Sequence, residues 1–210
     1  MTSSHIKKIV ALLKKAYPGA DCSLDFRTPH QLLVATILSA QCTDERVNIV
    51  TKDLFKKYKK PRDYADADIR ELEEDIRSTG FFRNKAKSIK ESAAVIENHY
   101  HGKMPDTMAD LVKLPGVGRK TASVILGTAF RKAEGIVVDT HVMRLSQRLG
   151  LTKNSDAVKI EKDLMEILPK ADWIIFSHLM ISHGRAVCKA RKPDCAACVL
   201  AELCPSAGSF

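Results

Sequence analysis

The stretch Leu114-Pro-Gly-Val-Gly-Arg-Lys-Thr-Ala122 is the part of the chain that decides the fold. It lies between two apolar segments with helical spacing, residues 107–113 and 121–130. Pro115 is expected to end the first helix, because proline lacks a backbone donor and disfavours a helical residue before it. The stretch therefore predicts two helices joined by a short hairpin.

The hairpin has features that suit a phosphate group. Gly116 and Gly118 permit a backbone turn that most residues resist, and they leave no side chain in the way of a ligand. Arg119 and Lys120 open the second helix, whose first-turn N–H groups and positive dipole end attract anions. An ordinary helix–helix connection is the alternative, and Gly-x-Gly alone would favour it. The Arg-Lys pair, in a chain with a net charge of +9, favours a phosphate site instead.

The composition narrows the class of protein. The chain has 210 residues, 45% of them hydrophobic, which is enough for one large domain or two small ones with a buried core. The excess of 34 Lys and Arg over 25 Asp and Glu favours a polyanionic partner such as nucleic acid, although solubility alone would also explain it. The chain shows neither the apolar core of a signal peptide nor an apolar run long enough to span a bilayer, so we expect a soluble, intracellular protein with no membrane partner.

Hydrophobic spacing predicts helices along nearly the whole chain, and therefore an all-α fold class. The segment Ile136-Val-Val138 has strand character but is too short to predict a strand. Besides the hairpin pair, helices are expected at residues 6–13, 28–39, 43–54, 69–76, 84–100, 140–149, 160–168 and 172–183.

Lys120 is the first candidate for chemistry. A lysine amine is nucleophilic only when it is unprotonated, and water keeps it protonated at neutral pH. A place in the first helical turn, the neighbouring Arg119 and partial burial would each lower the pKa of Lys120, as a Schiff-base lysine requires. By position alone, however, a second phosphate-binding cation beside Arg119 is the better interpretation.

Asp139 is the second candidate. It follows the apolar segment Ile136-Val-Val138 and precedes Thr140, where a helix is expected to begin. An ordinary helix N-cap is a strong interpretation of an aspartate in this place. A carboxylate near Lys120 would instead stabilise positive charge developing on a sugar, or help to activate the amine.

Four cysteines near the C-terminus form the third candidate site, Cys188-x6-Cys195-x2-Cys198-x5-Cys204. Four thiols at such short spacing in an intracellular protein indicate a metal site rather than disulfides. Zinc and iron–sulfur clusters both accept four thiolates, so the spacing leaves the metal open.

Three segments together resemble one protein family. The stretch from Leu114 to Ala122 resembles the helix-hairpin-helix of the endonuclease III family of base-excision DNA glycosylases. Ile136-Val-Val-Asp-Thr-His-Val142 is similar to the segment that carries the catalytic aspartate of that family, and the four cysteines resemble its iron–sulfur loop. The resemblance runs in order along nearly the whole chain.

The resemblance implies two all-helical lobes with a DNA-binding groove between them. One lobe is a continuous six-helix domain, residues 22–132, which contains the helix-hairpin-helix at about 107–130. The other lobe combines residues 1–21 with residues 133–210 and contains the cysteine loop.

The resemblance also implies catalytic roles and a cofactor. Lys120 occupies the position of the family's nucleophile, and Asp139 that of its catalytic aspartate. The four cysteines would hold a [4Fe–4S] cluster, which the family uses structurally. Related mismatch glycosylases have Tyr or Ser at the position of Lys120 and lose most lyase ability, so the lysine indicates a bifunctional enzyme.

Contacts with DNA are expected on three segments. Gln41 lies in a loop that resembles the family loop whose glutamine fills the gap left by a flipped base, although a helix-terminal amide explains it equally well. Phe81 lies in the opposing loop and would insert into the base stack, or else it is a core aromatic; the family often has an aliphatic residue there. Phosphate contacts are expected from the hairpin and from the cysteine loop. For the basic residues of the cysteine loop, the alternative is that they balance the charge of an anionic cluster. The residues expected to contact phosphates are Gly116, Gly118, Arg119, Thr121, Lys189, Arg191 and Lys192.

These features predict a DNA glycosylase that removes oxidised pyrimidines and cleaves the strand by β-elimination through a Schiff base on Lys120. Its partner would be double-stranded DNA that contains damaged pyrimidines or abasic sites. We expect a monomer in the cytoplasm, associated with the nucleoid through DNA. The alternatives are a glycosylase for mismatched or uracil-containing pairs, a non-catalytic helix-hairpin-helix module, and an electron carrier that uses the cluster.

Overall fold

The computed structural model describes residues 3–209 and divides the chain into two compact units. Unit 1 comprises residues 1–21 and 133–210, and unit 2 comprises residues 22–132. The described residues contain helices and no β-strand, so the all-α fold class predicted from the sequence is confirmed. Within the same residues, no helix combines the length and the apolar character needed to cross a membrane.

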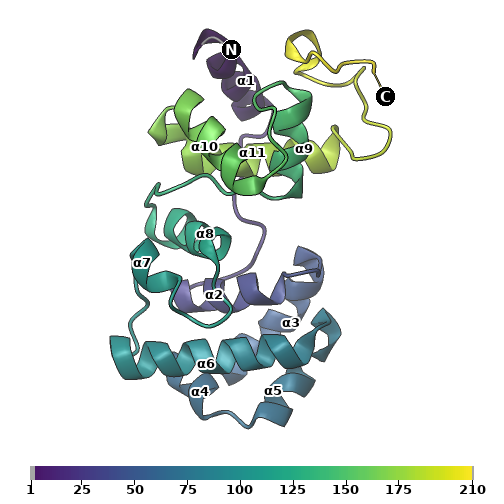
Figure 1. The fold of residues 1–210 in the computed structure, drawn as a ribbon. Helices are drawn as coiled ribbons and strands as arrows, with labels where there is room; N and C mark the ends of the chain where they lie inside the picture. Colours follow the sequence, from purple (N-terminus) through teal and green to yellow (C-terminus); the bar gives the residue numbers. More distant parts are fainter. Residues whose placement is uncertain (1–2, 210) are drawn as a thin grey trace. The chain divides into compact units, whose positions relative to one another are not determined.

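Unit 2 is built around one long helix, α6. Its helices are α2 Pro29–Leu38, α3 Asp44–Lys57, α4 Pro61–Asp66, α5 Ile69–Asp75, α6 Phe82–Tyr100, α7 Met108–Leu111 and α8 Arg119–Phe130, with a 3₁₀ turn η1 at Arg77–Thr79. Figure 1 shows α4 and α5 on one side of α6 and α2 on the other, with α8 packed against α2. The long helix therefore contacts elements on both of its sides, α2 on one and α4 and α5 on the other.

Helices α2 and α3 of unit 2 have threonine caps at their N-termini. Thr28 accepts a hydrogen bond from the backbone N–H of Gln31, and Pro29 opens α2 at its first position. Thr43 caps α3 in the same way. Helix α2 is buried along most of its length and lies in the core of unit 2.

Residues 22–132, all of which the structure describes, form seven α-helices, one more than the six expected. The additional helix is the short α4. Pro61 opens it, and the Asp63 carboxylate accepts hydrogen bonds from two backbone N–H groups just before it, at 2.7 and 3.0 Å. Tyr64 is fully buried and packs its ring against other aromatic side chains. A helix of this length is too short to show a hydrophobic repeat, so the sequence pattern did not predict it.

In the part of unit 1 that the structure describes, three α-helices follow the N-terminal one. The described helices are α1 Ser3–Ala16, α9 Thr140–Arg148, α10 Ala157–Ile167 and α11 Trp173–Ala186, with 3₁₀ turns η2 Lys170–Asp172 and η3 Ala201–Leu203. Helix α11 packs against α1 and α9, and α9 also contacts α10. Ile9, Leu13, Leu145 and Phe176 are buried in the core that these helices share.

The hairpin between α7 and α8 depends on Gly116. Its φ is +75°, and a Cβ at this position would lie 2.7 Å from the Cβ of Ser88 in α6. Leu114 and Val117 are buried and anchor the hairpin in the core of unit 2. The expectation that the turn needs both glycines is wrong for Gly118, whose φ of −86° suits any residue. A Cβ on Gly118 would meet nothing within 4 Å.

We predict that Gly116→Ala destabilises the protein by at least about 1 kcal/mol. A non-glycine residue in the left-handed region costs roughly 1–3 kcal/mol, and the new methyl group would also collide with Ser88. Gly118→Ala is the matched control, and its free energy of unfolding should change by less than about 0.5 kcal/mol. Denaturant unfolding of both variants measures the difference, and equal losses would contradict this account of the turn.

Candidate active site and cysteine-lined cavity

Lys120 lies in the first turn of α8, directly after the hairpin. The N-cap of this helix is Gly118, which provides no side-chain hydrogen bond to the first-turn N–H groups. An uncapped helix start of this kind suits an anion. Lys120 and Arg119 are both exposed, so the expectation that Lys120 is partly buried is wrong.

Asp139 caps the start of α9. Its Oδ1 atom accepts a hydrogen bond from the backbone N–H of Val142 at 2.8 Å, and the residue is half-buried. The interpretation of Asp139 as a helix N-cap is therefore confirmed. A carboxylate has about four lone-pair sites, so one capping bond fixes its orientation and leaves capacity for a second role. Asp139 belongs to unit 1, whereas Lys120 belongs to unit 2.

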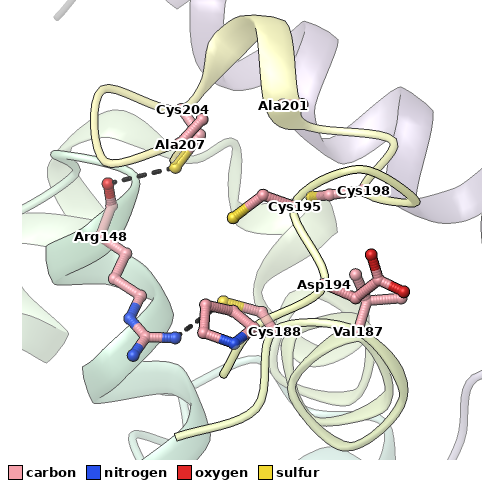
Figure 2. A pocket seen from close by; sticks show the side chains of 10 residues that line it. Arg148, Val187, Cys188, Asp194, Cys195, Cys198, Ala201, Cys204 and Ala207 are labelled. Atoms are coloured by element: carbon pink, nitrogen blue, oxygen red, sulfur yellow. Dashed lines mark hydrogen bonds between the residues drawn. The ribbon is translucent and has the colours of Figure 1, made fainter. Parts of the chain in front are cut away.

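The four cysteines of the C-terminal pattern line one cavity. The space measures about 310 Å³ including its opening to solvent, and all four thiols border it. Figure 2 shows the sulfur atoms of Cys188, Cys195, Cys198 and Cys204 around this space, with Arg148 reaching it from α9. A set of four thiols around one cavity is the donor set that iron–sulfur clusters take, so the residues fit such a group.

Burial raises the pKa of the Cys198 and Cys204 thiols. Desolvation disfavours the thiolate, which is the form that binds metal. Binding of a metal group to this cavity must therefore displace protons from these thiols.

Two arginines of α9 fasten the cysteine loop, and sequence analysis missed both. The guanidinium of Arg144 donates to the carbonyl of Cys188 at 2.9 Å and to that of Gly184 at 3.2 Å. The guanidinium of Arg148 lies 3.3 Å from the Cys188 Sγ and donates to the carbonyls of the next two residues at 2.8 and 3.0 Å. The four-residue spacing of the two arginines places them on one helix face, and this could have marked them as acting together. Their partners in the loop, however, are determined only by the tertiary fold.

His183 lies beside the same loop. Its side chain is almost fully buried, with Nδ1 2.9 Å from the Tyr17 hydroxyl and Nε2 3.4 Å from the Cys198 Sγ. Burial lowers the pKa of His183 and raises that of Tyr17. His183 is thus a hydrogen-bonded histidine within α11.

The residues expected to contact phosphates lie at the surface of their units. Gly116 and Gly118 are exposed at the hairpin, and Thr121 is half-buried one helical position after Lys120. The basic residues of the cysteine loop are likewise exposed: Lys189, Arg191 and Lys192.

Two loop tips in unit 2 have unusual backbone geometry. Gln41 and Phe81 both have left-handed backbones, with φ of +53° and +48°, and both are exposed. Phe81 is 64% exposed, so it is not a core aromatic, whereas Phe82 packs against the core. Sequence patterns do not report positive φ at non-glycine residues, so this shared feature was not predicted.

Two known families match the chain. The HhH-GPD superfamily base excision DNA repair protein family matches residues 34–170. The iron–sulfur binding domain of endonuclease III matches residues 188–204, which begin and end at the first and last cysteine of the pattern.

Similar proteins cover nearly the whole chain. Endonuclease III of Synechocystis sp. is 59% identical over 200 residues, covering 95% of this chain and 91% of that protein. Endonuclease III of Bacillus subtilis is 48% identical over 204 residues, covering 95% and 93%. A solved non-covalent endonuclease III–DNA complex aligns with a TM-score of 0.94 at 46% identity, covering 100% of this chain and 98% of that one.

A more distant structure, a thermostable thymine-DNA glycosylase, shares the fold with a TM-score of 0.88 at 24% identity. The first family match spans the hairpin and Asp139, and the second spans the four cysteines of the cavity. The chain therefore belongs to the endonuclease III family of HhH-GPD base-excision DNA repair enzymes.

Proposed function

We propose that this enzyme, a DNA glycosylase and abasic-site lyase that holds a [4Fe–4S] cluster, acts on oxidised pyrimidines in double-stranded DNA. The observation that carries the proposal is an exposed lysine, Lys120, in the first turn of α8 behind a hairpin with an uncapped helix start. Such a lysine can reach a sugar whose neighbouring phosphates lie against the hairpin.

The proposed reaction starts with a damaged nucleotide that is flipped out of the duplex. The Lys120 amine, after loss of its proton, attacks C1′ of the deoxyribose and the damaged base leaves. The amine then loses a further proton and the C1′–O4′ bond breaks, with O4′ taking up a proton, so the sugar ring opens to an imine. The imine makes the C2′ proton acidic, and loss of that proton expels the 3′ phosphate by β-elimination. One residue thus serves both base removal and strand cleavage.

Asp139 is proposed to act on the same nucleotide as Lys120. Its carboxylate would stabilise the positive charge that develops on the sugar as the base departs, and it would help to activate the amine. The capping bond to Val142 holds the carboxylate in one orientation, which favours such an electrostatic role.

We propose that the hairpin and the cysteine loop bind the phosphates on either side of the lesion. Gly118 has no contact that requires glycine within the protein, so close approach of DNA accounts for its missing side chain. Arg119 and Thr121 would assist at the hairpin. Gln41 and Phe81 are proposed to enter the duplex where the nucleotide has left. On the cysteine loop the phosphate contacts are assigned to Lys189, Arg191 and Lys192.

The four cysteines are proposed as ligands of the [4Fe–4S] cluster. When bound, the cluster supplies a structural cross-link for the loop from Cys188 to Cys204. Arg144 and Arg148 then orient the start of that loop through its carbonyls. We further propose that the enzyme works as a monomer in the cytoplasm, associated with the nucleoid.

Lys120→Ala should abolish strand cleavage and borohydride trapping on abasic DNA, because no amine remains to form the imine. Affinity for a duplex with an abasic-site analogue should stay within about five-fold, since the hairpin backbone is unchanged. The wild type should release bases from duplexes with oxidised pyrimidines in preference to mismatched or uracil-containing ones. Undiminished trapping by the variant would overturn the assignment of Lys120, and preference for another duplex would overturn the substrate.

Asp139→Asn keeps the shape of the cap and removes its charge, so base release in single turnovers should fall roughly 10²–10⁴-fold, the range of a general acid–base group. Asp156→Asn is the matched control, because Asp156 caps α10 in the same unit by bonds to two backbone N–H groups. The control should keep wild-type base release. Equal rates of base release in the two variants would show that Asp139 acts only as a helix cap.

Cys198→Ser should remove the brown colour and the iron, about four per chain in the wild type, and expose the C-terminal loop to proteases. Cys22→Ser, which changes a half-buried thiol outside the cavity, should keep both colour and iron. Absorbance, iron analysis and limited proteolysis make the comparison. Stoichiometric zinc in anaerobically purified protein would contradict the ligand assignment.

A further inference from the structure

A lysine is buried between the two loop tips of unit 2. Lys85 lies in the first turn of α6, and the residue is only 5% exposed. Its Nζ atom donates one hydrogen bond to the carbonyl of Leu38 and another to the carbonyl of Thr79, each at 2.8 Å. A buried ammonium is costly unless hydrogen bonds compensate it, so these two bonds are integral to the site.

Both carbonyls lie where a helix stops. Leu38 is the last residue of α2, and Thr79 is the last residue of η1. Carbonyls at helix ends lack a partner in the next turn, and Lys85 provides one for each. Burial lowers the pKa of Lys85, and the neighbouring Cys42 opposes that shift.

The two carbonyls lie at the start of the loops whose tips are Gln41 and Phe81. Gln41 follows Leu38 by three residues, and Phe81 follows Thr79 by two. Both tips have left-handed backbones, a strained state that persists only where the surrounding structure determines it. The Nζ atom of Lys85 lies 2.8 Å from each of the two carbonyl oxygens. It therefore fixes the spacing between the two loops as well as the start of each loop.

We propose that Lys85 is a positioning residue that couples the Gln41 and Phe81 loops, so that both tips enter the duplex as one rigid element. The inference rests on the proposed function for the role of the tips in DNA. Lys85 contacts neither DNA nor the reacting sugar in this role. It acts through the backbone of the two loops.

The chain provides a matched control on the same helix. Lys90 of α6 donates in the same manner to two backbone carbonyls, those of Ala65 and Ala67, at 2.7 and 2.6 Å. These carbonyls lie at the end of α4 and just after it, in a segment that contains neither loop tip. Lys90→Met thus removes the same kind of contact and leaves the hydrogen bonds of Lys85 in place.

The first measurement is hydrogen exchange of the free protein. In Lys85→Met, peptides that cover residues 37–44 and 76–83 should both exchange at least about ten-fold faster than in the wild type, whereas Lys90→Met should leave both unchanged. If Lys85→Met fails to fold, Lys85→Gln, which keeps a shorter donor, takes its place with the same expected direction. Acceleration of one loop alone, or of both loops in Lys90→Met, would overturn the coupling.

The second measurement is the ratio of affinities for an abasic-analogue duplex and an undamaged duplex. Lys85→Met should lower this ratio at least about ten-fold, and Lys90→Met should keep it. Adding Lys85→Met to the double variant Gln41→Ala/Phe81→Ala should cause little further loss, because Lys85 acts through those tips. Additive losses would overturn the proposal. A wild-type ratio near one would instead refute the proposed function, and hydrogen exchange would still decide whether Lys85 couples the loops.

Discussion

The backbone at Gly116 approaches Ser88 so closely that no side chain fits between them, and this contact ties the hairpin to α6. Helix α6 begins directly after Phe81, has Lys85 one turn later and reaches Ser88 in the turn beyond. A helix rises about 1.5 Å per residue, so the axial distance from the loop tip to the hairpin contact is about 10 Å and cannot vary much. Helix α6 therefore fixes the spacing between two proposed DNA contacts, the Phe81 tip and the hairpin.

Buried or half-buried cations satisfy the backbone where helices end. In unit 2, Lys85 and Lys90 each bind two carbonyls of neighbouring segments. In unit 1, Arg144 and Arg148 do the same for the cysteine loop. A chain of short helices has many terminal carbonyls, and one cation can serve several of them with charge-assisted bonds. Such bonds fix loops in place without requiring regular secondary structure.

The sequence was most informative where a local rule decides the structure. Thr28 caps α2 and Pro29 opens it, close to the predicted helix start at residue 28. The hairpin joins two helices as predicted, but the first of them, α7, ends at Leu111 and not at Pro115. Prediction failed where tertiary contacts decide: α4 was missed because one turn and a half shows no repeat, and Lys120 proved exposed. The partners of Arg144 lie about forty residues away in sequence, a distance over which spacing says nothing.

The cysteine loop buries too little apolar surface to be held in place by packing alone. Ordering a backbone costs roughly 1–2 kcal/mol per residue, and Leu200 is the one residue of the stretch from 188 to 204 that the described structure buries fully. The charged hydrogen bonds from the arginines of α9 contribute about 1.5–3 kcal/mol each, which offsets the ordering of only a few residues. The four proposed metal–thiolate bonds would add to these contacts, since metal ligation contributes directly to the folding free energy of small metal-binding segments. With the proposed ligands, the cluster would hold the basic side chains of this loop at the surface without a hydrophobic core beneath them.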